Sequence, residues 1–278
     1  MIAIVTDSTA YLTHEEAVEL GVVIVPMSYS LEEESSLNEG CIENDEHAER
    51  QVAEGIDHVH TSQATLAGFF NAFQRLRRAG YEVLCITISS RLSGTYANAV
   101  LAARELGGSH IEVVDSLTTC SGLYLLIREA RKRIREGAKL SAVAKELKEK
   151  RNRVRMRFSV DDMAPLRRSG RLGNVRMSIS TVLNIKPILE LKDGAIVSVS
   201  LARGRVEQTR RLCAFCEGVQ GEIVVNSFLA DEAAARLAVQ LAGDTREVER
   251  RRVGPVLGAH LGAGCMGVCY IAQEEKKR

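Results

Sequence analysis

The amino-acid sequence predicts a two-domain α/β protein, with a doubly wound, mainly parallel N-terminal sheet and a mixed α/β C-terminal domain. In the first half, short apolar runs alternate several times with helical segments, which is the pattern of a parallel sheet with right-handed crossovers. In the second half, Asp193-Gly194 separates two strand-like runs and indicates an antiparallel hairpin. The 278 residues are enough for two domains, which we expect to span residues 1–155 and 156–278.

The N-terminal half alternates between the two kinds of element. Apolar runs predict strands at residues 2–5, 22–25, 83–88 and 111–114. The expected helices run from Thr13 to Leu20, from Leu66 to Leu76, from Gly94 to about Leu106, from Leu117 to Arg135 and from Ser141 to Lys150. The first helix has a clear start, because Thr13 and Glu16 have the spacing of a capping box. Residues 31–46 are acidic, serine-rich and without period, so we expect a surface excursion there.

The pattern changes from Met156 onward, where short strands and helices are mixed. Strands are expected at residues 185–191, 195–201, 223–225 and 267–271, and helices at residues 206–215 and 231–241. Residues 274–278 read as a charged tail. The second domain should therefore be mixed rather than purely parallel.

Composition excludes several classes of partner and location. Lysine plus arginine (37) nearly equals aspartate plus glutamate (36), so no overall charge favours nucleic acid or an anionic membrane as the main partner. The first ten residues lack the charged and long apolar regions of a signal peptide, and no apolar run is long enough to span a membrane. The seven cysteines are odd in number and lie mostly in apolar surroundings, as free thiols do in a reducing compartment. We therefore expect a cytoplasmic protein.

Three loops carry hydroxyl residues between a strand and a helix: Asp7-Ser8-Thr9, Thr61-Ser62-Gln63 and residues 89–95. In an open α/β sheet such loops converge at the carboxyl edge of the strands, where ligands bind. Helix N-termini there present unpaired N–H groups and the positive end of the dipole, which suit a carboxylate or phosphate. For any one of these loops helix capping is the more common explanation, so the anion site is predicted from the three together.

The third loop has the most specific arrangement. Gly94 would let the backbone approach a ligand closely, while Ser93 and Thr95 supply hydroxyl donors beside the helix start. A serine nucleophile would need a nearby base, and no G-x-S-x-G elbow is present here. Binding is therefore favoured over acylation.

Two further segments place basic groups among glycines. Residues 166–172 hold three arginines around Gly170 and form either a solvated helix end or an anion or partner contact. With Gly170 at a helix C-terminus, Arg171 would project toward the space that the domains enclose. Residues 254–264 surround His260 with glycines. A single histidine is usually structural, yet this one is placed to hydrogen-bond an anion.

Two familiar motifs fail on context. Residues 262–267 spell G-x-G-x-x-G, but they precede a strand and the chain ends too soon for the ribose-binding acid. Cys213 and Cys216 form C-x-x-C inside a predicted helix, without a second zinc pair or a thioredoxin-like setting. The G-x-x-x-x-G-K-[ST] loop does not occur. We expect neither a metal nor a cofactor.

Taken together, the motifs resemble the DegV family over almost the whole chain. None is specific alone, but their order and spacing match. In the first half they are Asp7-Ser8-Thr9, Pro26, Thr61-Ser62-Gln63, Ser89-Ser90, Leu92-Ser93-Gly94-Thr95-Tyr96 and Asp115-Ser116. In the second half they are Gly170-Arg171-Leu172, Lys186-Pro187-Ile188, Gly254-Pro255 and Gly258-Ala259-His260.

The resemblance implies that the protein is not an enzyme but holds a long-chain fatty acid such as palmitate or oleate between its domains. The carboxylate is then presented to a separate fatty-acid kinase, whose acyl phosphate enters phospholipid synthesis. The resemblance also allows transient contact with a membrane surface during lipid exchange. Residues carried over by motif form two groups. Thr61, Ser62, Ser93, Thr95 and His260 would bind the carboxylate, and Arg171 and Arg203 would lie nearby or contact the partner.

The chain departs from the family pattern at Ala64, Leu261 and Ala263, where the family often has Pro, Thr and Pro. These changes would alter tail selectivity or partner docking and leave the hydroxyl residues in place. Two other classes of function stay open. One is a hydrolase or transferase that uses Ser93 with His260 as base on an acyl substrate, and the other is a regulatory protein for which the lipid is a signal.

Overall fold

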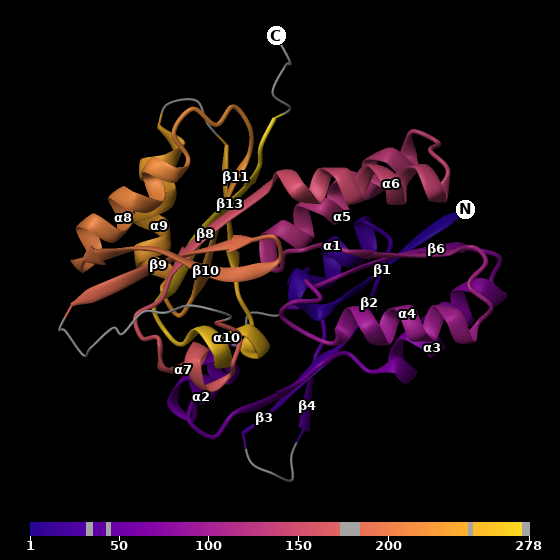
Figure 1. Ribbon diagram of the computed structural model, residues 1–278, viewed down its shortest axis with the longest axis horizontal. Coiled ribbons are helices and arrows are strands. Elements are labelled where there is room, and N and C mark those ends of the chain that lie inside the picture. The colour runs from indigo at the N-terminus through magenta and orange to yellow at the C-terminus, as the bar shows by residue number, and fades with distance from the viewer. Residues whose placement is uncertain (32–35, 43–45, 173–183, 244–246, 274–278) are drawn as a thin grey trace.

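The computed structural model describes residues 1–31, 36–42, 46–172, 184–243 and 247–273. Within these ranges the strands form three sheets, and the N-terminal and C-terminal halves lie side by side (Figure 1). The predicted charged tail lies outside the described residues, as does part of the predicted excursion at residues 31–46.

The largest sheet of the N-terminal half is four-stranded and parallel, as predicted. Its strands, in the spatial order β2-β1-β6-β7, are Val22–Val25, Ile2–Asp7, Glu82–Thr87 and Ile111–Asp115. All three pairings are parallel. From β1 the chain moves first to β2 on one side and later to β6 on the other. The connections therefore diverge between β1 and β6, which is where a ligand site forms in such sheets.

Helices cover both faces of this sheet, which confirms the doubly wound prediction. They are α1 (His14–Glu19), α3 (Leu66–Arg78), α4 (Thr95–Glu105), α5 (Cys120–Arg135) and α6 (Leu140–Lys150). Helices α3 and α4 lie on one side of the strands, and α5 and α6 lie on the other (Figure 1). The capping box is also confirmed, because the Thr13 side chain accepts from Glu16 N and Glu16 accepts from Thr13 N.

The chain between β2 and α3 contains elements that the sequence did not predict. Strands β3 (Met27–Ser30), β4 (Ser36–Glu39) and β5 (His60–Ser62) form an antiparallel sheet in the order β4-β3-β5, and α2 spans Glu46–Glu54. The expectation of a surface excursion is wrong at Glu39, which is 7% exposed. Its carboxylate accepts from Val256 N at 2.8 Å, so a tertiary contact, and not apolar periodicity, fixes this strand.

The C-terminal half holds a six-stranded mixed sheet, as predicted. In the spatial order β10-β9-β8-β13-β11-β12 its strands are Ala195–Arg203, Ile185–Lys192, Val154–Ser159, Cys265–Ile271, Ile223–Phe228 and Val248–Arg252. Among the described pairings of this sheet, only β11–β12 is parallel. The predicted hairpin is confirmed: Asp193 and Gly194 have φ angles of 49° and 80°, as a tight two-residue turn requires.

Four helices accompany this sheet in the described ranges: α7 (Ala164–Arg168), α8 (Gly204–Phe215), α9 (Asp231–Ala242) and α10 (Pro255–Leu261). Helices α8 and α9 pack on its outer face around a small separate core. The inner face shares one hydrophobic core with the N-terminal half, because Tyr11 and Cys120 belong to the same cluster as Val256 and Cys265. A boundary near residue 155 stays a prediction; β8 begins at Val154.

Candidate functional site

A cavity of about 320 Å³ opens between the two halves of the molecule. Its volume lies in the range of small-molecule sites. Most of the wall is apolar and comes from both halves, including Met27, Ile88, Met156, Phe158, Leu191 and Val256. The polar side chains at the wall include residues of the two later hydroxyl loops. The cavity therefore has the composition expected for an amphipathic guest.

The first group at the wall is a hydrogen-bonded pair from distant parts of the chain. Thr61 lies on β5, where it pairs with Tyr29 of β3. His260 lies on α10, and its Nε2 atom is 2.9 Å from Thr61 Oγ1. Both residues line the cavity. The small sheet and the C-terminal glycine-rich segment thus meet at this part of the wall.

His260 is neutral at physiological pH. Its burial, together with the positive charge of Arg171, lowers the pKa of the imidazole to about 4. A neutral ring can donate to or accept from Thr61, depending on the tautomer. Arg171 also lines the cavity, and its Nε donates to Leu92 O at 3.4 Å. Among the described lining residues, Arg171 is therefore the one that brings a formal charge to an anionic guest.

The second group at the wall is the Ser93 hydroxyl, just before α4. Ser93 lines the cavity, and its Oγ is 2.9 Å from Thr95 Oγ1. Thr95 is fully buried and outside the lining; its hydroxyl also accepts from Ala64 N at 3.3 Å. Thr95 thus lies behind Ser93, where it fixes the Ser93 rotamer and ties the two loops together.

Gly94 permits a close approach, but the group that approaches it is the side chain of Gln63 and not a ligand, as the sequence suggested. A Cβ atom added at Gly94 would lie 2.2 Å from Gln63 Oε1, so a larger residue would collide with the Gln63 side chain. Ser62 and Gln63 are exposed and line the cavity. They therefore form part of its mouth.

The structure does not bring every predicted group to this site. Asp7 is fully buried away from the cavity, where its carboxylate accepts from Ile88 N at 2.7 Å and from Thr9 N at 3.0 Å. The loop Asp7-Ser8-Thr9 thus caps the short helix that follows β1 and links β1 to the end of β6. This is the helix-capping interpretation, not the anion-site one. Arg203 is exposed at the end of β10 and lies outside the cavity lining.

The arrangement favours binding over serine nucleophile chemistry. A nucleophile and its base should lie within hydrogen-bonding reach of each other. Among the described contacts, His260 bonds Thr61 while Ser93 bonds Thr95, so the two are not paired. A histidine whose pKa is near 4 is also a weak base.

Sequence reasoning missed the floor of the cavity, which the inner face of the C-terminal sheet supplies. Asn226 of β11 and Gly267 of β13 lie opposite each other there, and both line the cavity. The available signal was a single asparagine directly after the apolar run 223–225, but periodicity does not tell which face it occupies.

Within the described part of the chain, no cluster of three or more His, Cys, Asp or Glu side chains could hold a metal ion. Cys213 lies on α8 and Cys216 follows its last residue, and neither is part of a disulfide; residues 262–267 run into β13, as the sequence indicates. None of the helices described is both long and apolar enough to cross a bilayer.

Glu39 supports α10, the helix that carries His260, and its titration is testable. Its Oε1 accepts from Val256 N, and Ser8 Oγ lies 3.1 Å from its Oε2. Burial, opposed by these hydrogen bonds, raises the pKa of the carboxyl to about 8. The folded protein then binds an extra proton at this residue between about pH 4.5 and 8, so the stability contributed here is present at low pH and lost as pH rises through 8.

We expect Glu39→Gln to flatten the dependence of the unfolding free energy on pH between about 5 and 9. Glutamine does not titrate, its oxygen can still accept from Val256 N, and its amide nitrogen can donate to Ser8 Oγ as a protonated carboxyl would. Urea denaturation at several pH values measures this. Glu54→Gln, at an exposed position of α2, is the matched control and should leave the slope unchanged. If Glu39→Gln kept the wild-type slope of unfolding free energy against pH, a different residue would have to be the titrating group.

Comparisons with known proteins give a consistent result. A family model described as an uncharacterised protein of the DegV family matches residues 1–273. A DegV domain-containing protein of Halalkalibacterium halodurans is 33% identical over 281 residues, with 98% of this chain and 99% of that protein covered. Protein DegV of Bacillus subtilis is 30% identical over 280 residues, with 97% and 98% covered.

Solved structures agree with these relatives. A structure described as fatty acid binding of a DegV family protein from Thermus thermophilus has a TM-score of 0.85 at 29% identity, covering 98% of this chain and 99% of that one. The structure of DegV from Bacillus subtilis, described as a fatty acid binding protein, has a TM-score of 0.84 at 28% identity, with the same coverage.

Proposed function

The chain belongs to the DegV family, and we propose that its cavity binds a long-chain fatty acid. The observation that carries the proposal is the cavity itself: an apolar space between the two halves with hydroxyl groups and one arginine at its wall. Each buried methylene of a tail contributes about 0.8 kcal/mol, so the head group needs only a few hydrogen bonds. The related proteins whose structures are described as fatty-acid binding support this proposal.

In this proposal Thr61, Ser62 and Ser93 bind the carboxylate and Arg171 supplies the opposite charge. Neutral His260 orients the Thr61 hydroxyl through their 2.9 Å contact, and in one tautomer it also offers a donor. Thr95 acts indirectly, since it holds Ser93 from behind.

The second part of the proposal is that the chain presents its bound fatty acid to a partner enzyme. The chain would hold the fatty acid while a separate fatty-acid kinase phosphorylates the carboxylate, and the acyl phosphate would serve phospholipid synthesis. Free cysteines are in keeping with a cytoplasmic location, and loading would need transient contact with a membrane surface. Ser93 and His260 do not form a nucleophile–base pair, which favours a binding protein over the hydrolase or transferase alternative.

The binding proposal is tested on the purified protein. Native mass spectrometry and solvent extraction should find a fatty acid, and the delipidated protein should bind palmitate or oleate in calorimetry. The same preparation should not turn over acyl esters or thioesters. An empty protein that binds neither acid would refute the proposal, and steady acyl hydrolysis would favour the enzyme alternative.

Arg203→Ala separates binding from presentation. Arg203 is exposed at the end of β10 and makes no contact with the cavity, so it is free to meet a partner. We expect unchanged lipid content and a several-fold slower formation of acyl phosphate with the cognate kinase, an effect that added salt reproduces. Arg104→Ala, an exposed arginine on α4, is the control. A wild-type rate for Arg203→Ala would show that it does not contact the kinase.

A further inference from the structure

Where it lines the cavity, the inner face of the C-terminal sheet is apolar except at one position; Glu249 and Arg251 of β12 lie on the same face but outside the lining. Along β11, Val224 and Phe228 face the shared core, and Asn226 lies between them on the same face. Its neighbours across the sheet are Gly267 of β13 and then Phe158 of β8. All three members of this row line the cavity, and Asn226 is 7% exposed. A primary amide therefore stands in the part of the wall where a hydrocarbon tail would lie.

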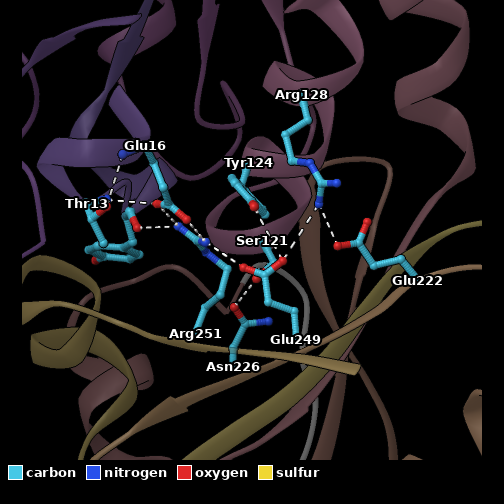
Figure 2. A network of polar contacts seen from close by, with 10 residues as sticks. Thr13, Glu16, Ser121, Tyr124, Arg128, Glu222, Asn226, Glu249 and Arg251 are labelled. Carbon is cyan, nitrogen blue, oxygen red and sulfur yellow. Dashed lines mark hydrogen bonds and ion pairs between the residues drawn. The ribbon is translucent and has the colours of Figure 1, made fainter. Parts of the chain in front are cut away.

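The hydrogen bonds of Asn226 are incomplete. Its Oδ1 accepts from the hydroxyl of Ser121, which is 1% exposed on α5. Figure 2 shows this contact, with the amide nitrogen turned away from Ser121. Among the described residues, Nδ2 makes no hydrogen bond. The contact with Ser121 joins the two halves and accounts for the oxygen, but it leaves two N–H donors at the cavity wall without a partner.

A second polar group in this part of the wall is also unsatisfied. Thr119 lines the cavity just before α5, and its Oγ1 is buried with no hydrogen-bond partner among the described residues. Its interaction within the protein is with the thiol of the adjacent Cys120, which is a weak hydrogen-bonding group. The Asn226 donor at the cavity wall and the buried Thr119 hydroxyl both lack a strong protein partner, which indicates that a guest or a water in the cavity supplies one.

We propose that Asn226 is a specificity residue, and that the preferred guest is a fatty acid with a hydroxyl on its chain, away from the carboxylate. This inference rests on the proposed fatty-acid binding and names the class of fatty acid. The chain hydroxyl would accept from Asn226 Nδ2 inside the apolar cavity. A plain hydrocarbon tail would instead leave this donor desolvated and unpaired, which disfavours its binding.

The test compares stearate with hydroxystearates that differ only in the position of the hydroxyl, using calorimetry on the delipidated full chain. At least one isomer should bind the wild-type protein about tenfold more tightly than stearate, the effect of one satisfied donor. Asn226→Leu should abolish or reverse that preference, because leucine has a similar volume and no donor. Ser121→Ala is the matched control: it breaks the same contact between the halves but keeps the amide, so the preference should persist.

The outcomes separate this inference from the function on which it rests. If the wild-type protein binds stearate at least as tightly as every isomer, the inference fails and fatty-acid binding stands; this comparison needs no variant. A preference that survives in folded Asn226→Leu, as judged by its thermal unfolding, also overturns it. If neither stearate nor any isomer binds, the proposed function itself has failed.

Discussion

Replacing Thr61 and Ser93 together by alanine is expected to weaken the binding of palmitate by at least a hundredfold. Each hydroxyl would donate to the carboxylate, and a hydrogen bond to a charged group contributes about 1.5–3 kcal/mol. The loss of two would then come to roughly 3–6 kcal/mol, where each 1.4 kcal/mol is tenfold in affinity. Ser93→Ala alone should lose about tenfold or more.

The two hydroxyls act at a shared site, so their effects should not simply add. Thr61→Ala also removes the partner of His260 Nε2, and the half-buried ring would then turn or take up water. Arg171 stays in both variants and keeps part of the attraction for the carboxylate. For this reason a double-mutant cycle, and not the double variant alone, measures how the two groups cooperate.

Ser90→Ala is the matched control, because Ser90 lies in the same loop as Ser93 but is exposed and outside the cavity lining. It should bind palmitate like the wild-type protein. Calorimetry on delipidated samples gives the affinities, and thermal unfolding confirms that each variant is folded. If the double variant kept wild-type affinity, the carboxylate would have to lie at another part of the cavity.

The sequence predicted the groups at the cavity mouth because their signals are local. Ser93 stands between β6 and α4, and parallel strands bring such loops to one edge. Thr61 was expected in a loop of the same kind, but it lies on β5 of the small antiparallel sheet, which brings it to the cavity by another route. His260 was found through the glycines around it. Two of these glycines have packing reasons: a Cβ at Gly258 would lie 2.3 Å from the Phe228 ring, and one at Gly254 would lie 2.6 Å from Tyr11.

Other parts of the fold could not be predicted because tertiary contacts determine them. Strand β4 has no apolar alternation and is held by the hydrogen bond from Val256 N to Glu39. Likewise, β12 reads as a charged run, Val-Glu-Arg-Arg-Arg, and it becomes a strand because its charges find partners in the other half of the molecule. Asn226 belongs to the same class, since nothing in its sequence neighbourhood shows which sheet face it occupies.

Arg251 of β12 is the residue through which these charges join the two halves. Its guanidinium donates to Glu16 at 2.6 and 2.7 Å and to Glu249 at 2.7 Å (Figure 2). It also donates to Tyr11 O at 2.7 Å and lies 3.7 Å from the centre of the Tyr124 ring. The side chain is only 7% exposed. Glu16, Tyr11 and Tyr124 belong to the N-terminal half, so one buried cation holds it to the C-terminal sheet.

Arg251→Ala should lower the free energy of unfolding by about 3–5 kcal/mol, because removing one partner of a buried ion pair leaves the others uncompensated. Urea denaturation at pH 7 measures the loss. Arg250→Ala is the control one residue earlier on β12, where the side chain is exposed, and it should change stability by less than about 0.5 kcal/mol. A loss below about 1 kcal/mol for Arg251→Ala would mean that water replaces the guanidinium without cost.

The difference in unfolding free energy between Arg251→Ala and the wild-type protein should become smaller in acid. Burial alone would raise the pKa of Glu16, but the hydrogen bonds and charge of Arg251 outweigh it, and the pKa is lowered from 4.5. Near this pH the unfolded chain binds more protons than the folded one, so wild-type stability from this pair is present above about pH 4.5 and declines as pH falls. Arg251→Ala removes the lowering, and its stability should fall less in this range. The gap between the two proteins should therefore narrow from pH 7 to pH 4, and a constant gap would show that Arg251 acts through packing on Tyr124 rather than through its charge.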